Sequence, residues 1–189
     1  MITEQSRYSR RILLAVSGLS PQVVTETLYA LAVVRRPPFV PTEVHLLTTA
    51  EGAERASLSL LSDDPGWFAR LCQEYDLPPI AFSRDSIHVL ETAARERLTD
   101  IRTQEENQAA ADAITEWVRS FTADPGAALH VSIAGGRKTM GFFAGYAPSL
   151  LGRAQDRLSH VLVSAPFESH PGFFYPTKES RIIYTPPPD

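Results

Sequence analysis

The sequence has little of three things that would narrow its function at once: cysteine, excess positive charge and long apolar runs. Cys72 is the only cysteine, so an internal disulfide and a cysteine-built metal site are both excluded, and a reducing cytoplasm is the expected compartment. The net charge of −4 argues against a binder of duplex nucleic acid. The apolar run over residues 12–16 is too short for a signal peptide, and no run approaches membrane-spanning length.

The composition is that of a globular protein. The 189 residues are 43% hydrophobic and 21% charged, which is enough to bury a proper core and gives no sign of disorder. We find no internal repeat and no linker that would split the chain. We therefore expect one domain over residues 1–189, with residues 1–10 and 185–189 as frayed tails.

Strand-like and helix-like patterns alternate along the chain. Strands are predicted at residues 11–17, 42–48, 86–90, 127–134 and 159–164, and helices at 22–34, 51–61, 66–75, 104–121 and 138–151. Ser20 is expected to cap the first helix, with Pro21 at its first position. Residues 80–82 are a candidate edge piece, residues 91–103 a loop or small subdomain, and residues 173–184 a last strand or hairpin. The alternation predicts an α/β fold with a doubly wound, mostly parallel, Rossmann-like sheet.

The stretch over residues 129–142 carries the clearest local signal. An apolar run ends in Gly135 and Gly136, a basic pair follows at Arg137 and Lys138, and Thr139 opens a helical pattern. A helix N-terminus attracts anions through its free N–H groups and its dipole, so phosphate is the first ligand to consider. The alternative is a turn in which the glycines merely permit positive φ beside two solvated cations.

Small and hydroxyl residues follow three of the predicted strands. They are Ser17-Gly18, Thr48-Thr49 and Gly135-Gly136. In a doubly wound sheet, ligands bind outside the carboxyl ends of the strands, where the strand order reverses. We therefore expect these three loops to converge on one site.

Several common chemistries do not fit the residues. Arg137 separates Gly136 from Lys138 and Val131 stands where a Walker A loop needs its first glycine, so a nucleoside triphosphate site is disfavoured. The loop after the first strand lacks the Gly-x-Gly-x-x-Gly spacing of a dinucleotide site, and no Gly-x-Ser-x-Gly elbow exists. The five histidines are scattered singly, and those within strand patterns are best explained as structural. We expect neither a metal nor a cofactor.

The remaining chemistry is that of a phosphodiester pocket built from hydroxyls, backbone amides and one or two cations. Such a pocket can orient a ribose 2′-hydroxyl for attack on its own phosphate without a metal. Lys138 would neutralise the developing charge, and Ser17 would hold a phosphate oxygen or the 2′-oxygen. The motifs contain no evident general base, which predicts a slow enzyme.

Four segments resemble one known family, the CRISPR-associated Rossmann-fold family, abbreviated CARF. They are Ser-Gly-Leu-Ser-Pro-Gln at the start of residues 17–31, Asp-Ile-Arg-Thr at 100–103, His-Val-Ser-Ile-Ala-Gly-Gly-Arg-Lys-Thr-Met-Gly at 130–141, and residues 159–171, which resemble a small single-domain branch. The resemblance implies a homodimer that binds a cyclic oligoadenylate, the second messenger of type III CRISPR defence, with the tetra-adenylate favoured over the hexa-adenylate.

The resemblance also implies roles for individual residues. In the ring nucleases of this family, a hydroxyl residue after the first strand and a lysine in the later glycine motif carry activity, and these positions are Ser17 and Lys138. Arg137 would contact phosphate, and Arg102 would do so from the 91–103 loop. The full set of expected ligand-binding residues is Gly18, Leu19, Ser20, Gln22, Thr48, Thr49, Arg102, Gly135, Gly136, Arg137 and Thr139.

Three hypotheses remain open at this point. The first is a metal-independent ring nuclease that leaves 2′,3′-cyclic phosphate ends, favoured by Ser17 and Lys138 and by the short chain after Tyr184. The second is a non-catalytic sensor that signals to a partner or a fused effector, with residues 186–188, all proline, as the start of a linker. The third is an unrelated phosphate-binding α/β protein.

Overall fold

A computed structural model describes residues 5–168 and 170–184 and contains one five-stranded sheet. Every pair of neighbouring strands is parallel, and the strand order is β3-β2-β1-β4-β5. The strands are β1 Arg10–Val16, β2 Glu43–Thr48, β3 Ile87–Val89, β4 Ala127–Ser132 and β5 Arg157–Ser159. The chain proceeds from β1 to one edge and then returns to build the other, so the order reverses between β1 and β4.

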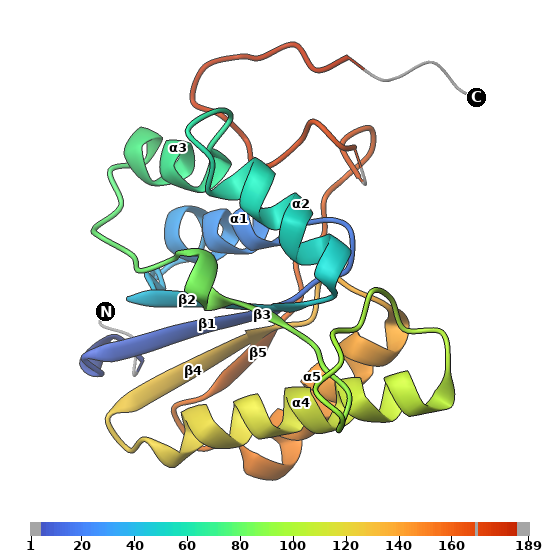
Figure 1. The fold of residues 1–189 in the computed structure, drawn as a ribbon. Coiled ribbons are helices and arrows are strands. Elements are labelled where there is room, and N and C mark those ends of the chain that lie inside the picture. The colour runs from blue at the N-terminus through green and yellow to red at the C-terminus, as the bar shows by residue number, and fades with distance from the viewer. Residues whose placement is uncertain (1–4, 169, 185–189) are drawn as a thin grey trace.

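Helices cover both faces of this sheet, as Figure 1 shows. The helices are α1 Gln22–Tyr29, α2 Ala50–Leu60, α3 Trp67–Glu74, α4 Gln104–Ala123 and α5 Lys138–Leu151. Helix α1 continues as a π-helical turn, η2 Ala30–Val34, and short 3₁₀ turns lie at η1 Gln5–Arg7 and η3 Arg84–Ser86. Helices α1, α2 and α3 lie on one face, and α4 and α5 lie on the other. The predicted doubly wound, Rossmann-like α/β class is confirmed.

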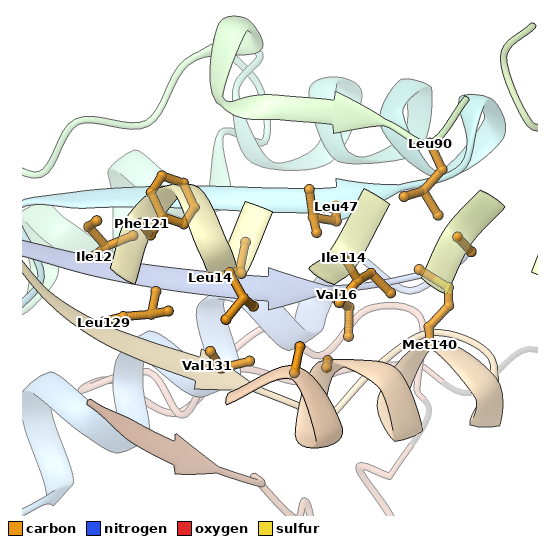
Figure 2. Close-up of a cluster of buried hydrophobic side chains, with 14 of the residues drawn as sticks. Ile12, Leu14, Val16, Leu47, Leu90, Ile114, Phe121, Leu129, Val131 and Met140 are labelled. Atoms are coloured by element: carbon orange, nitrogen blue, oxygen red, sulfur yellow. The ribbon is translucent and has the colours of Figure 1, made fainter. Parts of the chain in front are cut away.

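Strand β1 explains why both faces are covered. Ile12, Leu14 and Val16 pack with α4 and α5 in one core cluster, part of which is drawn in Figure 2. Leu13 and Ala15 point the other way and pack with α1, α2 and α3. Because successive side chains of a strand alternate between faces, a continuous apolar run requires an apolar layer on each side. All five side chains are fully buried, so the run predicted from sequence lies at the centre of the sheet.

Two predictions near the C-terminus need correction. Strand β5 begins two residues earlier than predicted and ends at Ser159, because β4 offers it partners only from His130 to Ser132. Residues 160–164 leave the sheet without forming a strand. Within residues 170–184 no strand or hairpin forms; instead Phe174 is buried and its ring stacks on Trp67 of α3 at a centroid distance of 5.0 Å.

Smaller predictions at the ends of elements also need correction. The lead-in is ordered where it is described, since η1 forms and Arg10 already belongs to β1. Strand β4 ends at Ser132 and leaves Ala134 to the following turn. The edge piece at 80–82 is confirmed as a single bridge between Ala81 and Glu43. The proposed linker at 186–188 lies outside the described residues, and no described helix is long and apolar enough to cross a membrane.

Candidate functional site

The loops that follow β1, β2 and β4 meet at the carboxyl edge of the sheet, as expected for a topological switch point. A Cβ atom on Gly18 would lie 3.7 Å from the Cα of Gly136, which shows how closely the loops after β1 and β4 approach. The Thr48 hydroxyl, at the end of β2, donates to the Gly18 carbonyl at 3.3 Å. The three predicted loops therefore form one continuous surface.

The loop after β1 is tightened by its own serine. Ser17 is 1% exposed, and its hydroxyl donates to the Ser20 carbonyl at 2.8 Å. The predicted cap by Ser20 is wrong, because the N-cap position falls on Pro21, whose side chain offers no acceptor. Leu19 and Ser20 remain exposed at the tip of this turn. The candidate catalytic hydroxyl is thus already bonded to backbone in this structure.

The two threonines at the end of β2, Thr48 and Thr49, hold neighbouring segments through their hydroxyl groups. Thr48 is fully buried, and Thr49 is 4% exposed. The Thr49 hydroxyl caps α2 by accepting from the Gly52 N–H at 3.3 Å. Both predicted ligand-binding hydroxyls are therefore occupied within the protein.

The turn after β4 presents an open helix N-terminus. Gly136 has a φ of +82°, a left-handed conformation that favours glycine. Arg137 is the N-cap of α5, and its side chain makes no capping hydrogen bond. The first intrahelical bond runs from the Gly141 N–H to the Arg137 carbonyl at 3.2 Å, so the N–H groups of residues 138–140 have no partner within the helix. These groups and the helix dipole attract an anion.

Three cations, Arg102, Arg137 and Lys138, stand beside this turn and are called the cationic rim. Asp100 binds both arginines: its carboxylate accepts from Arg137 Nε at 2.8 Å and from Arg102 Nε at 3.0 Å. Arg137, the Ile101 N–H and Arg102 together hold the pKa of the Asp100 carboxyl well below its usual range. Lys138 is exposed, and its side chain forms no hydrogen bond or ion pair with any residue that the structure describes.

The 91–103 segment, which sequence could not assign, delivers Asp100 and Arg102 to the rim. It turns back on itself through a bridge between Glu91 and Arg97, and Leu98 and Ile101 are buried in the core beneath α4. Two apolar anchors on either side of Asp100 fix where its carboxylate can reach. Thr103 then caps α4: its hydroxyl accepts from the Glu106 N–H, and the Glu106 carboxylate accepts from the Thr103 N–H.

A cavity of about 360 Å³ opens on the other side of the glycine turn and is called the α1 cavity. It lies between the start of α1, the turn at Gly135–Gly136 and the segment that follows β5. Its lining comprises Ser20, Gln22, Val23, Glu26, Ala134, Gly135, Gly136, His160, Val161, Leu162, Val163, Glu168 and His170. Only Ser20, Gln22 and the two glycines among these were predicted as site residues.

Glu26 is a titratable residue of this cavity that was not predicted from the sequence. It lies one helical turn after Gln22, so both face the α1 cavity, and the i, i+4 spacing was the available signal. Burial raises the pKa of the Glu26 carboxyl to about 7. Its side chain has no hydrogen-bond or ion-pair partner among the described residues. His160 and His170 lie within residues 159–171, which carried part of the family resemblance, but neither was singled out as a site residue.

The histidines within strands are structural, as predicted. His45 Nδ1 and His88 Nε2 lie 2.9 Å apart, and the His88 ring stacks on Trp117. His130 is buried and pairs its Nε2 with the Ser159 hydroxyl at 2.8 Å. Across the described part of the chain, no group of three or more histidine, cysteine, aspartate or glutamate side chains could hold a metal ion.

Two solved structures are similar to this chain over its sheet and helices. Csm6 from Enterococcus italicus, bound to cyclic hexa-2'-fluoro-hexa-dAMP, is 13% identical with a TM-score of 0.46, over 85% of this chain and 34% of that one. A Listeria monocytogenes structure assigned as a UDP-N-acetylglucosamine 2-epimerase is 19% identical with a TM-score of 0.36, over 81% of this chain and 31% of that one. The chain spans about a third of each structure's length, and neither likeness indicates a function.

A comparison with curated proteins finds no match. The family model described as CRISPR-associated protein NE0113 matches residues 20–189. This range contains most of the four segments that carried the resemblance noted from sequence, including the 91–103 segment and the glycine turn before α5, but it begins after Ser17, Gly18 and Leu19. The predicted membership of a CRISPR-associated family with a Rossmann-like fold is confirmed, and the chain belongs to the CRISPR-associated protein NE0113 family.

Proposed function

We propose that this protein binds a cyclic oligoadenylate and cleaves it as a ring nuclease that needs no metal. The observation that carries the proposal is the open N-terminus of α5 with Lys138 at its first residue. Membership of a CRISPR-associated family supports cyclic oligoadenylate as the ligand. In the Csm6 structure the bound molecule is a cyclic hexa-adenylate analogue, and both ring sizes belong in any test.

The rim offers two kinds of cation for this chemistry. Arg137 and Arg102 share the Asp100 carboxylate, so much of their charge is already balanced. Lys138 has no such partner among the described residues, and its ammonium group can approach a phosphate directly. Lys138 would therefore stabilise the charge that develops on the non-bridging phosphate oxygens, together with the N–H groups that open α5.

The proposed reaction is an internal transesterification. The ribose 2′-oxygen bonds to the adjacent phosphorus and loses its proton, while the bond from phosphorus to the 5′-oxygen breaks and that oxygen gains a proton. The products carry a 2′,3′-cyclic phosphate and a 5′-hydroxyl. Ser17 would hold the 2′-oxygen or a phosphate oxygen by exchanging its Ser20 partner for the ligand.

We further propose a homodimer in which two such edges face each other across a two-fold axis. Phe142, Tyr146 and Leu150 form an apolar stripe along α5 and are 63%, 53% and 63% exposed. The stripe begins one turn after Lys138, so a second copy seated on it would bring two rims together. Sedimentation equilibrium of the wild-type protein checks this, and a monomer at micromolar concentration would contradict it.

The deciding experiment is single-turnover cleavage of labelled cyclic tetra- and hexa-adenylate in EDTA. Lys138→Ala is expected to slow cleavage by about 100-fold or more, because one charge-stabilising group is lost from the transition state. Lys178→Ala is the matched control, since Lys178 is the other lysine of the sequence and pairs with Asp76 instead. Full activity in Lys138→Ala would refute the assigned role.

The same assay separates the nuclease from the sensor hypothesis. Rings that bind tightly and remain intact after long incubation would favour the non-catalytic sensor. Ser17→Ala tests the second assigned residue: if it cleaves at the wild-type rate, the Ser17 hydroxyl serves the turn alone.

A further inference from the structure

The α1 cavity differs from the rim in charge. None of the described residues that line it is lysine or arginine, whereas Glu26 and Glu168 both contribute carboxyl groups. A phosphate would meet only acidic or neutral side chains there. The cavity volume of about 360 Å³ is at the small end for ligand pockets and suits one nucleobase with its ribose, not a whole ring.

Gln22 leaves an unpaired acceptor in this cavity. Its Nε2 donates to the Pro171 carbonyl at 3.1 Å. Because that carbonyl can only accept, the amide orientation is determined and Oε1 must point elsewhere. Oε1 is buried and has no hydrogen-bond partner among the described residues. Buried polar atoms are nearly always paired, so this oxygen indicates a missing donor.

His170 leaves an unpaired donor in the same cavity. Its Nδ1 accepts from the Gly172 N–H at 3.0 Å, so the proton of the neutral ring lies on Nε2. Nε2 is buried and has no hydrogen-bond partner in the described part of the chain. Glu26 adds a carboxyl that keeps an accepting oxygen in both protonation states, so Gln22, Glu26 and His170 together bring two acceptors and one donor to the cavity.

Adenine has the complementary groups on one edge. Its exocyclic amino group carries two donor hydrogens, and the neighbouring ring nitrogen accepts. Hypoxanthine, which has an oxygen in place of the amino group, would set an acceptor against Gln22 Oε1 and against the ionised Glu26 carboxylate. A site built to hydrogen-bond an N–H group rejects an analogue that lacks it, since its own buried groups are then left unpaired.

We propose that the α1 cavity is a base-reading subsite in which Gln22 and Glu26 accept from the adenine amino group and His170 donates to the adjacent ring nitrogen. The proposal rests on the function proposed above and adds the residues that select the base. The phosphates of the same ligand lie at the rim, on the far side of the Gly135–Gly136 turn. Glu26 is thereby a specificity-determining residue.

The test compares the affinities of rings that differ only in the base. Fluorescence titrations use 2′-deoxy cyclic tetra- and hexamers of adenylate and of inosinate, which cannot be cleaved by 2′-oxygen attack. The wild-type protein is expected to bind the adenine ring about 10- to 100-fold more tightly than the inosine ring of the same size. Glu26→Leu is expected to bring this ratio to about threefold or less, because an acceptor is lost.

Two variants act as matched controls. Glu26→Gln keeps an accepting oxygen at the same place and is expected to retain at least half of the wild-type preference on a logarithmic scale. Glu54→Gln neutralises an exposed carboxylate of α2 that does not line the cavity and is expected to leave the ratio unchanged. Thermal melts show whether each variant is folded. If Glu26→Leu does not fold, the base preference of Glu26→Gln is the test of the Glu26 role.

The outcomes separate the two proposals. Equal affinity of the wild-type protein for adenine and inosine rings overturns the base-reading subsite and leaves ring binding intact. An unchanged preference in Glu26→Leu removes Glu26 from base selection. If no adenylate ring of either size binds, the proposed function fails and the subsite fails with it.

Discussion

The cationic rim and the α1 cavity lie on opposite sides of one glycine turn, and they differ in exposure and in charge. The rim is exposed, carries Lys138 and two arginines, and balances part of its charge on Asp100. The cavity has no cation among its described lining residues and leaves buried polar atoms unpaired. Exposed charge attracts an anion over distance but discriminates poorly, whereas unpaired groups in a closed space discriminate between bases. In the proposed function, charge is therefore supplied on one side of the turn and base selectivity on the other.

The largest expected effect comes from the turn that both regions share. Gly136 has a φ of +82°, which is strained for a residue with a Cβ, and a Cβ there would lie 3.0 Å from the Met140 sulfur. Gly136→Ala is expected to lower the free energy of unfolding by about 1–3 kcal/mol. It should also impair ring cleavage and adenine preference together, which denaturant titration and the two ligand assays measure.

Gly145→Ala is the control for that change. Gly145 is also a glycine of the α5 region, but a Cβ there would meet only Leu158 Cδ2 at 4.0 Å. Alanine in a helix interior should then stabilise by up to about 1 kcal/mol without altering either assay. Loss of only one of the two activities in Gly136→Ala would show that the turn does not couple the two regions.

The next effect concerns the cavity alone and depends on pH. The pKa of Glu26 is raised from 4.5 to about 7 by burial, so between these values the folded protein holds a proton that the unfolded chain releases. Stability therefore falls as the pH rises through this window, and the loss is complete above about 7. Glu26→Gln should match the wild type near pH 4.5 and exceed its stability by about 1–3 kcal/mol at pH 8.

Thermal or denaturant unfolding across pH 4–9 measures this difference. The other titratable groups that line the cavity, His160, Glu168 and His170, remain in both proteins and cancel in the comparison. A difference between variant and wild type that does not change with pH would mean that Glu26 does not carry a burial penalty.

The smallest effect concerns the rim alone. Asp100→Asn keeps an oxygen for the Ile101 N–H, which Asp100 accepts at 2.7 Å, but removes the negative charge shared by Arg137 and Arg102. Ring affinity is expected to rise about two- to fivefold at low salt and less at high salt, with base preference unchanged. Glu116→Gln, which removes the same charge from an exposed pair with Arg119, is the control. Weaker binding in Asp100→Asn would show that the carboxylate positions Arg137 for the ligand.

Most of the fold follows from patterns that are local in the sequence. The apolar run of β1 requires cover on both faces, and the start of α5 at Lys138 was predicted to the residue. The predictions failed where the chain leaves the sheet, at β5 and in residues 173–184. An edge strand ends where the neighbouring strand no longer provides backbone hydrogen-bond partners, and a single sequence does not indicate that position.

The site was predictable to the same extent. Strand-end position identified the loops with Ser17, Thr48 and Gly136, because parallel strands bring their carboxyl ends to one edge. The uses of those hydroxyls were not predictable, since Ser17 bonds Ser20 and Thr49 caps α2 within the protein. A hydroxyl group can hydrogen-bond either a ligand or the protein backbone, and only the folded geometry determines which partner it has.

The sequence by itself determined the parallel α/β class, the glycine turn and the cation at Lys138, because each depends on residues adjacent in the chain. The tertiary structure alone decided which groups those features meet. Asp100 reaches Arg137 across 37 residues, and Gln22 is oriented by the Pro171 carbonyl 149 residues away. Such contacts are set by packing of distant segments on a common core, and that packing left Glu26, Gln22 and His170 around one cavity.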